Sequence, residues 1–332
     1  MGSMASPLSR RRLGALGLGL AAGLALRGAP GTARMLAGVR PTPRVIVDND
    51  FAGDPDGLVA LAYQLAAPTT RTVLVTASAV DAHLAALVGK LPAGRTAAAG
   101  AAMAADLVSR ARPDQAPAIV AGSESFGAGT GQVSAAARAI VAEARRDDPL
   151  PLYVTCGGPL TNVAAALRLD SGIARRFTLI WIGGTSNPVG GTEYNLATDL
   201  AAARQVLEAS EVPFWQVPVE AYAACVLSQA ELAADFRPIS SLTEWLYKML
   251  VDVPPFVPPS GTKGLGDCAL VPLTAVSADA GRYASRPVRR LAADLSLHEE
   301  VAKRTVQRYE QIDNRMLVAD LLATLRLLEQ DR

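Results

Sequence analysis

Four aspartates stand within nine residues of one another in the stretch VIVDNDFAGDPDGL, positions 45–58. They are Asp48, Asp50, Asp54 and Asp56, and they come directly after an apolar run typical of a buried strand. Carboxylates this close repel one another, and leaving them unpaired costs free energy. A hard cation, Ca²⁺ or Mg²⁺, resolves the conflict, because the nearby ligands are all oxygens. The alternative is a solvated loop in which Asp54 and Asp56 cap a following helix.

The elements that must position these aspartates alternate between short apolar runs and amphipathic segments. Strands are predicted at 44–48, 72–78, 116–122, 151–157, 177–184 and 212–220, and helices at 57–66, 82–91, 133–146, 160–169 and 200–210. Strands that are apolar throughout indicate a parallel sheet covered on both faces. The fold class is therefore α/β: an open, mostly parallel, Rossmann-like sheet flanked by helices, with a mainly helical C-terminal elaboration after Tyr222. The segment 287–311 is compatible with strands or a hairpin.

The loops after the predicted strands are where chemistry belongs in such a fold. Ligands of open parallel sheets bind at the carboxyl ends of the strands. Here those loops read DNDFAGDPDG, TASAVD, TCGGPLTN and GGTSNPVGGTEYN, and all are rich in small and polar residues. We expect them to meet at one edge of the sheet and to form the binding site.

Composition narrows the class of partner. The 332 residues carry 32 basic and 31 acidic side chains, a net charge of +1, and only 5% are aromatic. A balanced charge and few aromatic residues argue against nucleic acid or an anionic membrane as a partner. The three cysteines, Cys156, Cys225 and Cys268, fit neither a zinc pattern nor a disulfide framework, and we expect them to be buried apolar residues.

The first forty residues differ from the rest. Arg10 to Arg12 precede an apolar run, Leu13 to Leu26, that is short for a membrane span. Residues 1–40 are interpreted as a twin-arginine-like export signal and linker, and 41–332 as a single domain. This predicts an exported protein, periplasmic or secreted, without stable membrane association after signal removal. An uncleaved membrane anchor is the alternative.

Three later segments, together with the aspartate loop, resemble motifs of the inosine–uridine nucleoside hydrolase family. GGPLTNVAAAL (157–167) is similar to that family's GPLTN segment, and NPVGGTEYN (187–195) is similar to its ribose-binding segment. The aspartate of LGDCALV (265–271) is similar to a late metal-binding aspartate. Each motif is weak by itself, but four in order are specific, and the resemblance runs from about Arg44 to the C-terminus.

The resemblance implies a Ca²⁺-dependent hydrolase that cleaves the N-glycosidic bond of ribonucleosides and releases ribose and base. The implied metal ligands are the carboxylates of Asp50, Asp56 and Asp267 and a backbone carbonyl at Gly157. Asp50 is also the implied catalytic base, which takes a proton from the attacking water. The implied ribose ligands are Asp54, Asn187, Glu193 and Asn195, although turn chemistry in a glycine-rich loop is the alternative for the last three. A homo-oligomer is compatible with the resemblance.

The chain departs from the family pattern in three places. Adjacent aspartates are replaced by Asp54-Pro55-Asp56, and we expect Asp56 to take the second position. Ser78-Ala79 replaces a Gly-Asn pair. Gly266 stands where many members carry a histidine that protonates the departing base. The only histidines, His83 and His298, are predicted to be surface residues, so the acid is unassigned. Tyr194, Glu220, Tyr222 and Trp215 could lie near the base, and Trp215 could only stack on it or donate a hydrogen bond.

Two further functions stay open. The chain could hydrolyse another furanoside or glycoside, sharing only the sugar end of the site, or it could be a non-catalytic exported protein that binds a sugar or nucleoside. A dinucleotide-binding enzyme is disfavoured, because the first strand's loop lacks G-x-G-x-x-G and its carboxylates would repel a pyrophosphate. Asp48, the last residue of the strand, is expected to brace the loop by accepting backbone N–H bonds.

Overall fold

The computed structural model describes residues 38–88, 91–127, 133–252 and 260–330. The predicted export segment, 1–40, lies outside the described residues apart from its last three. None of the described helices is both long and apolar enough to cross a bilayer.

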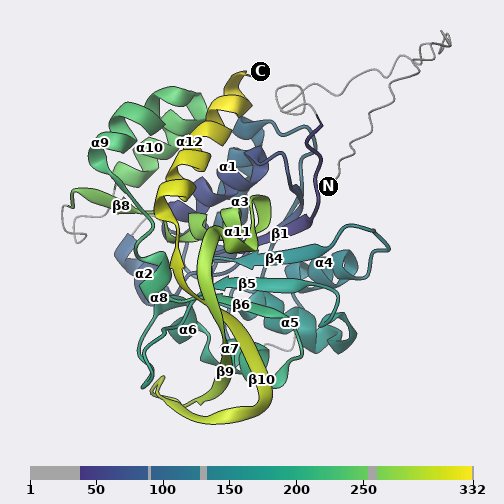
Figure 1. Ribbon diagram of the computed structural model, residues 1–332. Helices are drawn as coiled ribbons and strands as arrows, with labels where there is room; N and C mark the ends of the chain where they lie inside the picture. Colours follow the sequence, from purple (N-terminus) through teal and green to yellow (C-terminus); the bar gives the residue numbers. More distant parts are fainter. Residues whose placement is uncertain (1–37, 89–90, 128–132, 253–259, 331–332) are drawn as a thin grey trace, which may run out of the picture.

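An eight-stranded sheet forms the centre of the protein, in the order β3-β2-β1-β4-β5-β6-β10-β9 (Figure 1). Its strands are β1 (Arg44–Asn49), β2 (Arg71–Ala77), β3 (Ala118–Ala121), β4 (Leu152–Cys156), β5 (Thr178–Ile182), β6 (Phe214–Val217), β9 (Gly281–Leu291) and β10 (Leu297–Ile312). Neighbouring strands are parallel except β9 and β10, which form an antiparallel hairpin. The chain winds outward in both directions from β1, so the switch point of the sheet lies at the carboxyl ends of β1 and β4.

Helices cover both faces of the sheet, as the apolar strands predict (Figure 1). One face carries α1 (Asp56–Ala66), α3 (Thr96–Ala111), α10 (Ser241–Val251), α11 (Leu270–Ala275) and α12 (Asn314–Gln330). The other carries α4 (Ala135–Ala144), α5 (Thr161–Leu169) and α7 (Leu200–Ala209). Each face of the sheet packs against its helices in a separate hydrophobic core. Side chains of a strand alternate between faces, so Val45 and Val47 belong to the core beneath α1 and Ile46 to the core beneath α5.

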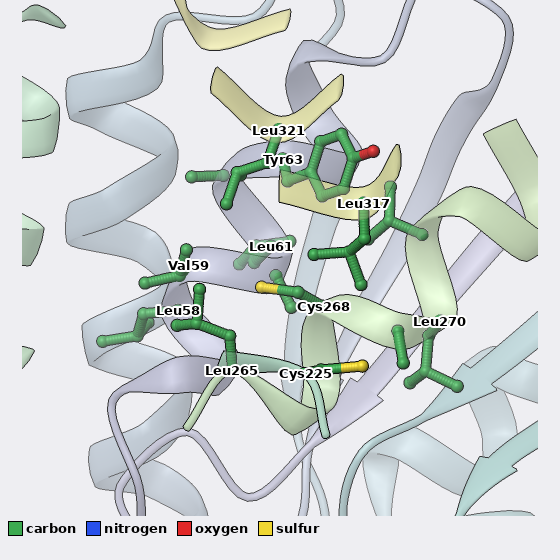
Figure 2. Packing of buried hydrophobic residues seen from close by; sticks show 14 of the residues in the cluster. Leu58, Val59, Leu61, Tyr63, Cys225, Leu265, Cys268, Leu270, Leu317 and Leu321 are labelled. Carbon is green, nitrogen blue, oxygen red and sulfur yellow. The ribbon is translucent and has the colours of Figure 1, made fainter. Parts of the chain in front are cut away.

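The core beneath α1 adjoins the aspartate loop, because α1 begins at Asp56. Figure 2 shows Leu58 and Leu61 of α1 packed among Leu317 of α12 and the side chains of Cys225 and Cys268. All three cysteines are buried and free, as predicted. Both α1 and the segment around Cys268 pack into this core. The core therefore fixes the position of the start of α1 relative to that segment.

The structure confirms the α/β sheet and the helical C-terminal part, and it differs in detail. The predicted strand 212–220 ends at Val217, because Pro218 interrupts it and the short helix α8 (Val219–Tyr222) follows. Segment 287–311 belongs to the β9–β10 hairpin. Helix α3 was not predicted. The smaller elements are α2 (Ala82–Val88), α6 (Tyr194–Thr198), α9 (Gln229–Glu231), β7 (Val226–Ser228) and β8 (Thr262–Gly264).

Candidate active site

A cavity of about 300 Å³ opens at the carboxyl ends of β1, β4 and β5. Its lining residues include Asp50, Asp54, Asp56, Gly157, Ile182, Glu193, Tyr194, Asn195, Tyr222, Gly266 and Asp267. Five of these carry carboxylates, and within the part of the chain that the structure describes no lysine, arginine or histidine lines the cavity. The structure therefore brings together every predicted site residue except Asn187.

Asp48 does not face the cavity but anchors the floor beneath it. Its carboxylate is fully buried and accepts hydrogen bonds from Thr76 Oγ1 at 2.5 Å, Asn162 Nδ2 at 2.8 Å and Ser78 Oγ at 3.1 Å. Cys156 Sγ is a fourth donor at 3.4 Å. Burial raises the pKa of Asp48, and these bonds oppose the rise. The bracing role is as predicted, but its donors are side chains and not backbone N–H groups.

The same network explains the Ser78-Ala79 departure. Ser78 uses its hydroxyl to bind Asp48, and both Ser78 and Ala79 are buried. Neither residue belongs to the cavity lining. The substitution therefore changes the support of the first strand's loop and leaves the cavity wall to other residues.

Three buried carboxylates meet at the cavity: Asp50, Asp56 and Asp267. The backbone N–H of Asp267 donates to Asp56 Oδ2 at 3.1 Å. Burial raises the pKa of Asp50 and of Asp56 well above the ordinary value, and the charge of Asp267 raises both further. Burial likewise raises the pKa of Asp267 to about 7. Carboxylates that repel one another, with no positively charged side chain among them, are typical of a cation-binding site.

Asn49 links the first strand to this group, a contact that the sequence analysis missed. Its Nδ2 donates to Asp267 Oδ2 at 2.9 Å. The fit around it is tight, because a Cβ at Gly157 would lie 2.3 Å from Asn49 Nδ2, and one at Gly57 would lie 2.6 Å from Asn49 Oδ1. Its place between two of the clustered aspartates was the signal available, but nothing local identifies a partner more than 200 residues away.

Asp54 occupies the exposed rim of the cavity. Its Oδ1 accepts the backbone N–H of Asp56, the first residue of α1, at 3.3 Å. Asp56 makes no cap of its own and turns its carboxylate to Asp267 instead. The capping alternative thus describes Asp54 in part, while the Asp56 carboxylate is directed to Asp267 and the cavity.

Glu193 and Asn195 form the wall that follows β5. The Glu193 carboxylate accepts the backbone N–H of Gly184 at 2.7 Å and of Leu196 at 2.9 Å, and it caps α6. Asn195 donates its amide to the carbonyls of Gly157 at 3.0 Å and Ile182 at 2.9 Å. These bonds tie the ends of β4 and β5 together and hold both polar groups at the cavity.

Asn187 lies elsewhere, in the exposed turn between β5 and α6. Its Oδ1 accepts the N–H of Val189 at 3.1 Å, and its carbonyl accepts the N–H of Gly190 at 3.0 Å. This is the turn chemistry weighed as the alternative. The structure does not bring Asn187 to the cavity.

Two of the four residues expected near the base, Tyr194 and Tyr222, line the cavity. Tyr194 accepts the backbone N–H of Asp81 on its hydroxyl at 3.2 Å, and burial and the charge of Asp50 raise its pKa to about 12. Tyr222 donates its hydroxyl to Glu193 Oε1 at 2.9 Å. Trp215 packs between Tyr153 and Tyr309, and Glu220 binds the Thr185 and Ser186 turn, so neither lines the cavity. His83 and His298 are exposed, as predicted.

The donor set fits a hard divalent cation in its chemistry. Asp50, Asp56 and Asp267 offer carboxylate oxygens and Gly157 a carbonyl, with no nitrogen or sulfur ligand among them. Across the described ranges, no group of three or more histidine, cysteine or acidic side chains stands in metal-holding geometry. The carboxylates share one cavity, but they are not a formed coordination shell.

The model of the inosine-uridine preferring nucleoside hydrolase family matches residues 45–330. The chain belongs to this family. It is accordingly a hydrolase that acts on the N-glycosidic bonds of nucleosides, and its substrate is a small molecule. No curated protein matches the chain.

Solved structures of nucleoside hydrolases share the fold at low identity. The inosine-uridine preferring nucleoside hydrolase of Bacillus anthracis is 18% identical, with a TM-score of 0.66 over 86% of this chain and 99% of that one. A plant nucleoside hydrolase is also 18% identical, with a TM-score of 0.64 over the same shares. A purine-preferring ribonucleoside hydrolase from Gardnerella vaginalis is 16% identical, with a TM-score of 0.61 over 87% and 99%.

Proposed function

We propose that this nucleoside hydrolase cleaves ribonucleosides to ribose and base in a Ca²⁺-dependent reaction. The observation that carries the proposal is the meeting of Asp50, Asp56 and Asp267, three buried carboxylates with raised pKa values, in one cavity. None of the described residues that line this cavity is basic. Burial and mutual repulsion raise those pKa values, and a bound divalent cation would offset both. The all-oxygen donor set favours Ca²⁺ over zinc.

The proposed roles follow from position. Asp50, Asp56 and Asp267, with the Gly157 carbonyl, would hold the cation, which supplies Lewis acidity toward water and sugar hydroxyls when bound. Asp50 accepts the proton of the attacking water, because it is the carboxylate that follows the central strand at the switch point. The remaining negative charge stabilises the positive charge that develops on the sugar in an oxocarbenium-like transition state.

Asp54, Glu193 and Asn195 are the proposed ribose ligands. All three line the same cavity, and each offers an oxygen or an amide to a sugar hydroxyl. Asn187 reaches the sugar only if the turn that holds it moves, so its part in binding is proposed for the substrate-bound form alone.

Reducing-sugar release tests the proposal. The substrates are p-nitrophenyl ribofuranoside and a panel of nucleosides, each with added Ca²⁺ and with a chelator. Nitrophenolate leaves without help from an acid, so this substrate reports the sugar end of the site alone. We expect Ca²⁺-dependent release from both. Release from the nitrophenyl riboside alone would indicate a different natural leaving group. Release from neither, with ribose still bound, would overturn the proposed hydrolysis in favour of a binding protein.

We also propose that the protein is exported, that residues 1–40 are the signal and linker, and that 41–332 form one domain. The support is the arginine cluster and the short apolar run that follows it. Fractionation of cells expressing the full chain tests the location, with Arg10–Arg12 changed to lysine as the comparison. Retention of the unaltered chain in the cytoplasm would contradict it. Light scattering of the purified protein decides whether a homo-oligomer forms.

A further inference from the structure

Tyr222 joins three separate parts of the cavity wall. It ends α8, the helix that follows β6, and its hydroxyl donates to Glu193 Oε1 at 2.9 Å in the wall that follows β5. Its ring lies against Gly266, in the segment that carries Asp267. Among the described residues, Tyr222 is the one side chain that donates a hydrogen bond to Glu193, whose other donors are backbone N–H groups.

Gly266 is what makes room for this ring. A Cβ at position 266 would lie 2.8 Å from Tyr222 Cδ2 and 3.5 Å from Cε2, so any other residue there forces the ring aside. Gly264, two residues earlier, has nothing within 4 Å of its Cβ position. The tight approach is therefore particular to the Gly266–Tyr222 pair.

Helix α8 is itself fixed by neighbouring backbone. The N–H of Val219 donates to the carbonyl of Gly184 at 3.0 Å, and the N–H of Tyr222 donates to the carbonyl of Pro218 at 3.1 Å. Gly184 is also the residue whose N–H binds Glu193. Backbone hydrogen bonds to Gly184 thus hold both Glu193 and the start of α8, the helix that ends at Tyr222. These contacts set the position of the tyrosine relative to the carboxylate that it binds.

We propose that Tyr222, admitted by Gly266, is the positioning residue that orients Glu193 toward the sugar and closes the cavity wall beside Asp267. This rests on the proposed ribonucleoside hydrolysis, in which Glu193 binds ribose. Tyr222 acts through Glu193, so losing its hydroxyl weakens ribose binding more than it slows bond cleavage. Gly266 acts through Tyr222, so its effect depends on the tyrosine ring being present.

The test is a double-variant cycle with Tyr222→Phe, Tyr222→Leu, Gly266→Ala and the Tyr222→Leu/Gly266→Ala double variant. Calorimetry gives the Kd for D-ribose, and hydrolysis of p-nitrophenyl ribofuranoside gives kcat and KM. We expect Tyr222→Phe to raise Kd and KM roughly tenfold and to change kcat less than threefold, because a hydrogen bond to a charged group is lost. Gly266→Ala should raise Kd by a similar factor, yet add less than twofold when Tyr222 is already leucine.

Urea unfolding supplies a second readout on the same variants. Gly266→Ala should lower the unfolding midpoint in the tyrosine background and much less in the leucine background. Gly264→Ala is the matched control for unfolding, because its added methyl group meets no atom. This separates a ring displaced by Gly266→Ala from a general intolerance of alanine in the segment.

The outcomes separate the inference from the proposed function. If the unaltered protein hydrolyses ribosides but Tyr222→Phe leaves Kd and KM unchanged, or Gly266→Ala acts equally in both backgrounds, the inference fails and the function stands. If the unaltered protein binds ribose without turnover, the function fails, and the cycle in Kd still decides the inference. If it neither binds ribose nor turns over, both are overturned.

Discussion

The backbone N–H of Asp267 donates to the Asp56 carboxylate at 3.1 Å, although 211 positions separate the two residues. Asn49 adds a second link, from the end of β1 to the Asp267 carboxylate at 2.9 Å. The late segment is thus held against the start of α1 by hydrogen bonds as well as by the core beneath it. Folding brings Asp267 and Glu193 to the carboxylates of the aspartate loop. The binding and titration of the whole group therefore depend on the fold.

Removal of the proposed base should abolish turnover. We expect Asp50→Asn to lower kcat on p-nitrophenyl ribofuranoside at least about a hundredfold, since positioned proton acceptors contribute on this scale. Asp106→Asn is the matched control, because it removes an exposed carboxylate on α3 whose partner is Arg110. Turnover by Asp50→Asn close to that of the unaltered enzyme would remove Asp50 from the mechanism.

Calcium should stabilise the folded protein. A cation that binds only the native state at about one hundred times its Kd adds about 2.7 kcal/mol to the free energy of unfolding. Calorimetric melting with Ca²⁺ and with a chelator should therefore give a Tm several degrees higher in Ca²⁺. Asp267→Asn should lose most of the difference, and Asp106→Asn should keep it. Equal Tm values with and without Ca²⁺ in the unaltered protein would argue against a resident calcium ion.

The metal-free protein should lose stability as pH rises. The pKa of Asp267 is about 7 in the folded chain and has the ordinary value of 3.8 when unfolded, so between these the folded state binds more protons. The stabilising effect is fully present below the unfolded pKa and is lost as pH rises through 7. Asp50 and Asp56 act in the same direction.

Urea unfolding in chelator measures this dependence. The free energy of unfolding should be on the order of a few kcal/mol greater near about pH 5 than near about pH 8. Asp267→Asn should flatten the dependence. A metal-free protein that becomes more stable between those two conditions would show that the buried carboxyls are not protonated in the fold.

The two asparagines of the predicted ribose segment should differ in importance. Asn195 is buried at the cavity and tied to the Gly157 and Ile182 carbonyls, whereas Asn187 is exposed in its turn. A lost bond to an uncharged group is worth about 1 kcal/mol, so we expect Asn187→Ala to change KM only a few-fold. Asn195→Ala also removes two structural bonds and should raise KM about tenfold or more. A larger KM effect at Asn187 would show that its turn closes over bound substrate.

Two threonines on β2 give a matched test of the Asp48 network. Thr76→Val removes a hydroxyl that donates to Asp48 at 2.5 Å, and it should cost about 1–3 kcal/mol of unfolding free energy. Thr72→Val should be neutral or stabilising, because the buried Thr72 hydroxyl has no hydrogen-bond partner among the described residues. Denaturant unfolding measures both. Equal effects would mean that the Asp48 bonds contribute nothing particular.

The central strands could be predicted because their signal is local. Apolar runs such as 44–48 must be buried on both faces, and the loops that follow parallel strands must share an edge. Helix α3 was not predicted because alanine and glycine make up most of its buried face, and Leu107 and Val108 are the only larger apolar residues there, so the helix has little hydrophobic contrast. Gly100 brings that helix so close that a Cβ there would lie 3.3 Å from the backbone nitrogen of Ala52.

The site was predictable where a motif carries it and not where packing does. The motif residues reach the cavity because most of their loops come directly after parallel strands and so lie at one edge of the sheet. They are Asp50, Asp56, Glu193, Asn195 and Asp267. Tyr222 reaches it because position 266, 44 residues later, lacks a side chain, and no local pattern records that relation. Asn187 has the spacing of a site residue, but its side chain accepts a hydrogen bond within its own turn and does not reach the cavity.

The burial of Asp48 has a consequence for how the protein opens. Its carboxylate accepts bonds from β2, β4 and α5 at once, and β1 is buried along its whole length between two parallel partners. Amide protons of β1 should therefore exchange with solvent only through global unfolding, while those of the exposed 186–189 turn exchange through local fluctuation. Substrate entry and release would then involve motions of the exposed loops around the cavity, while β1 and the Asp48 network beneath it stay closed in the native state.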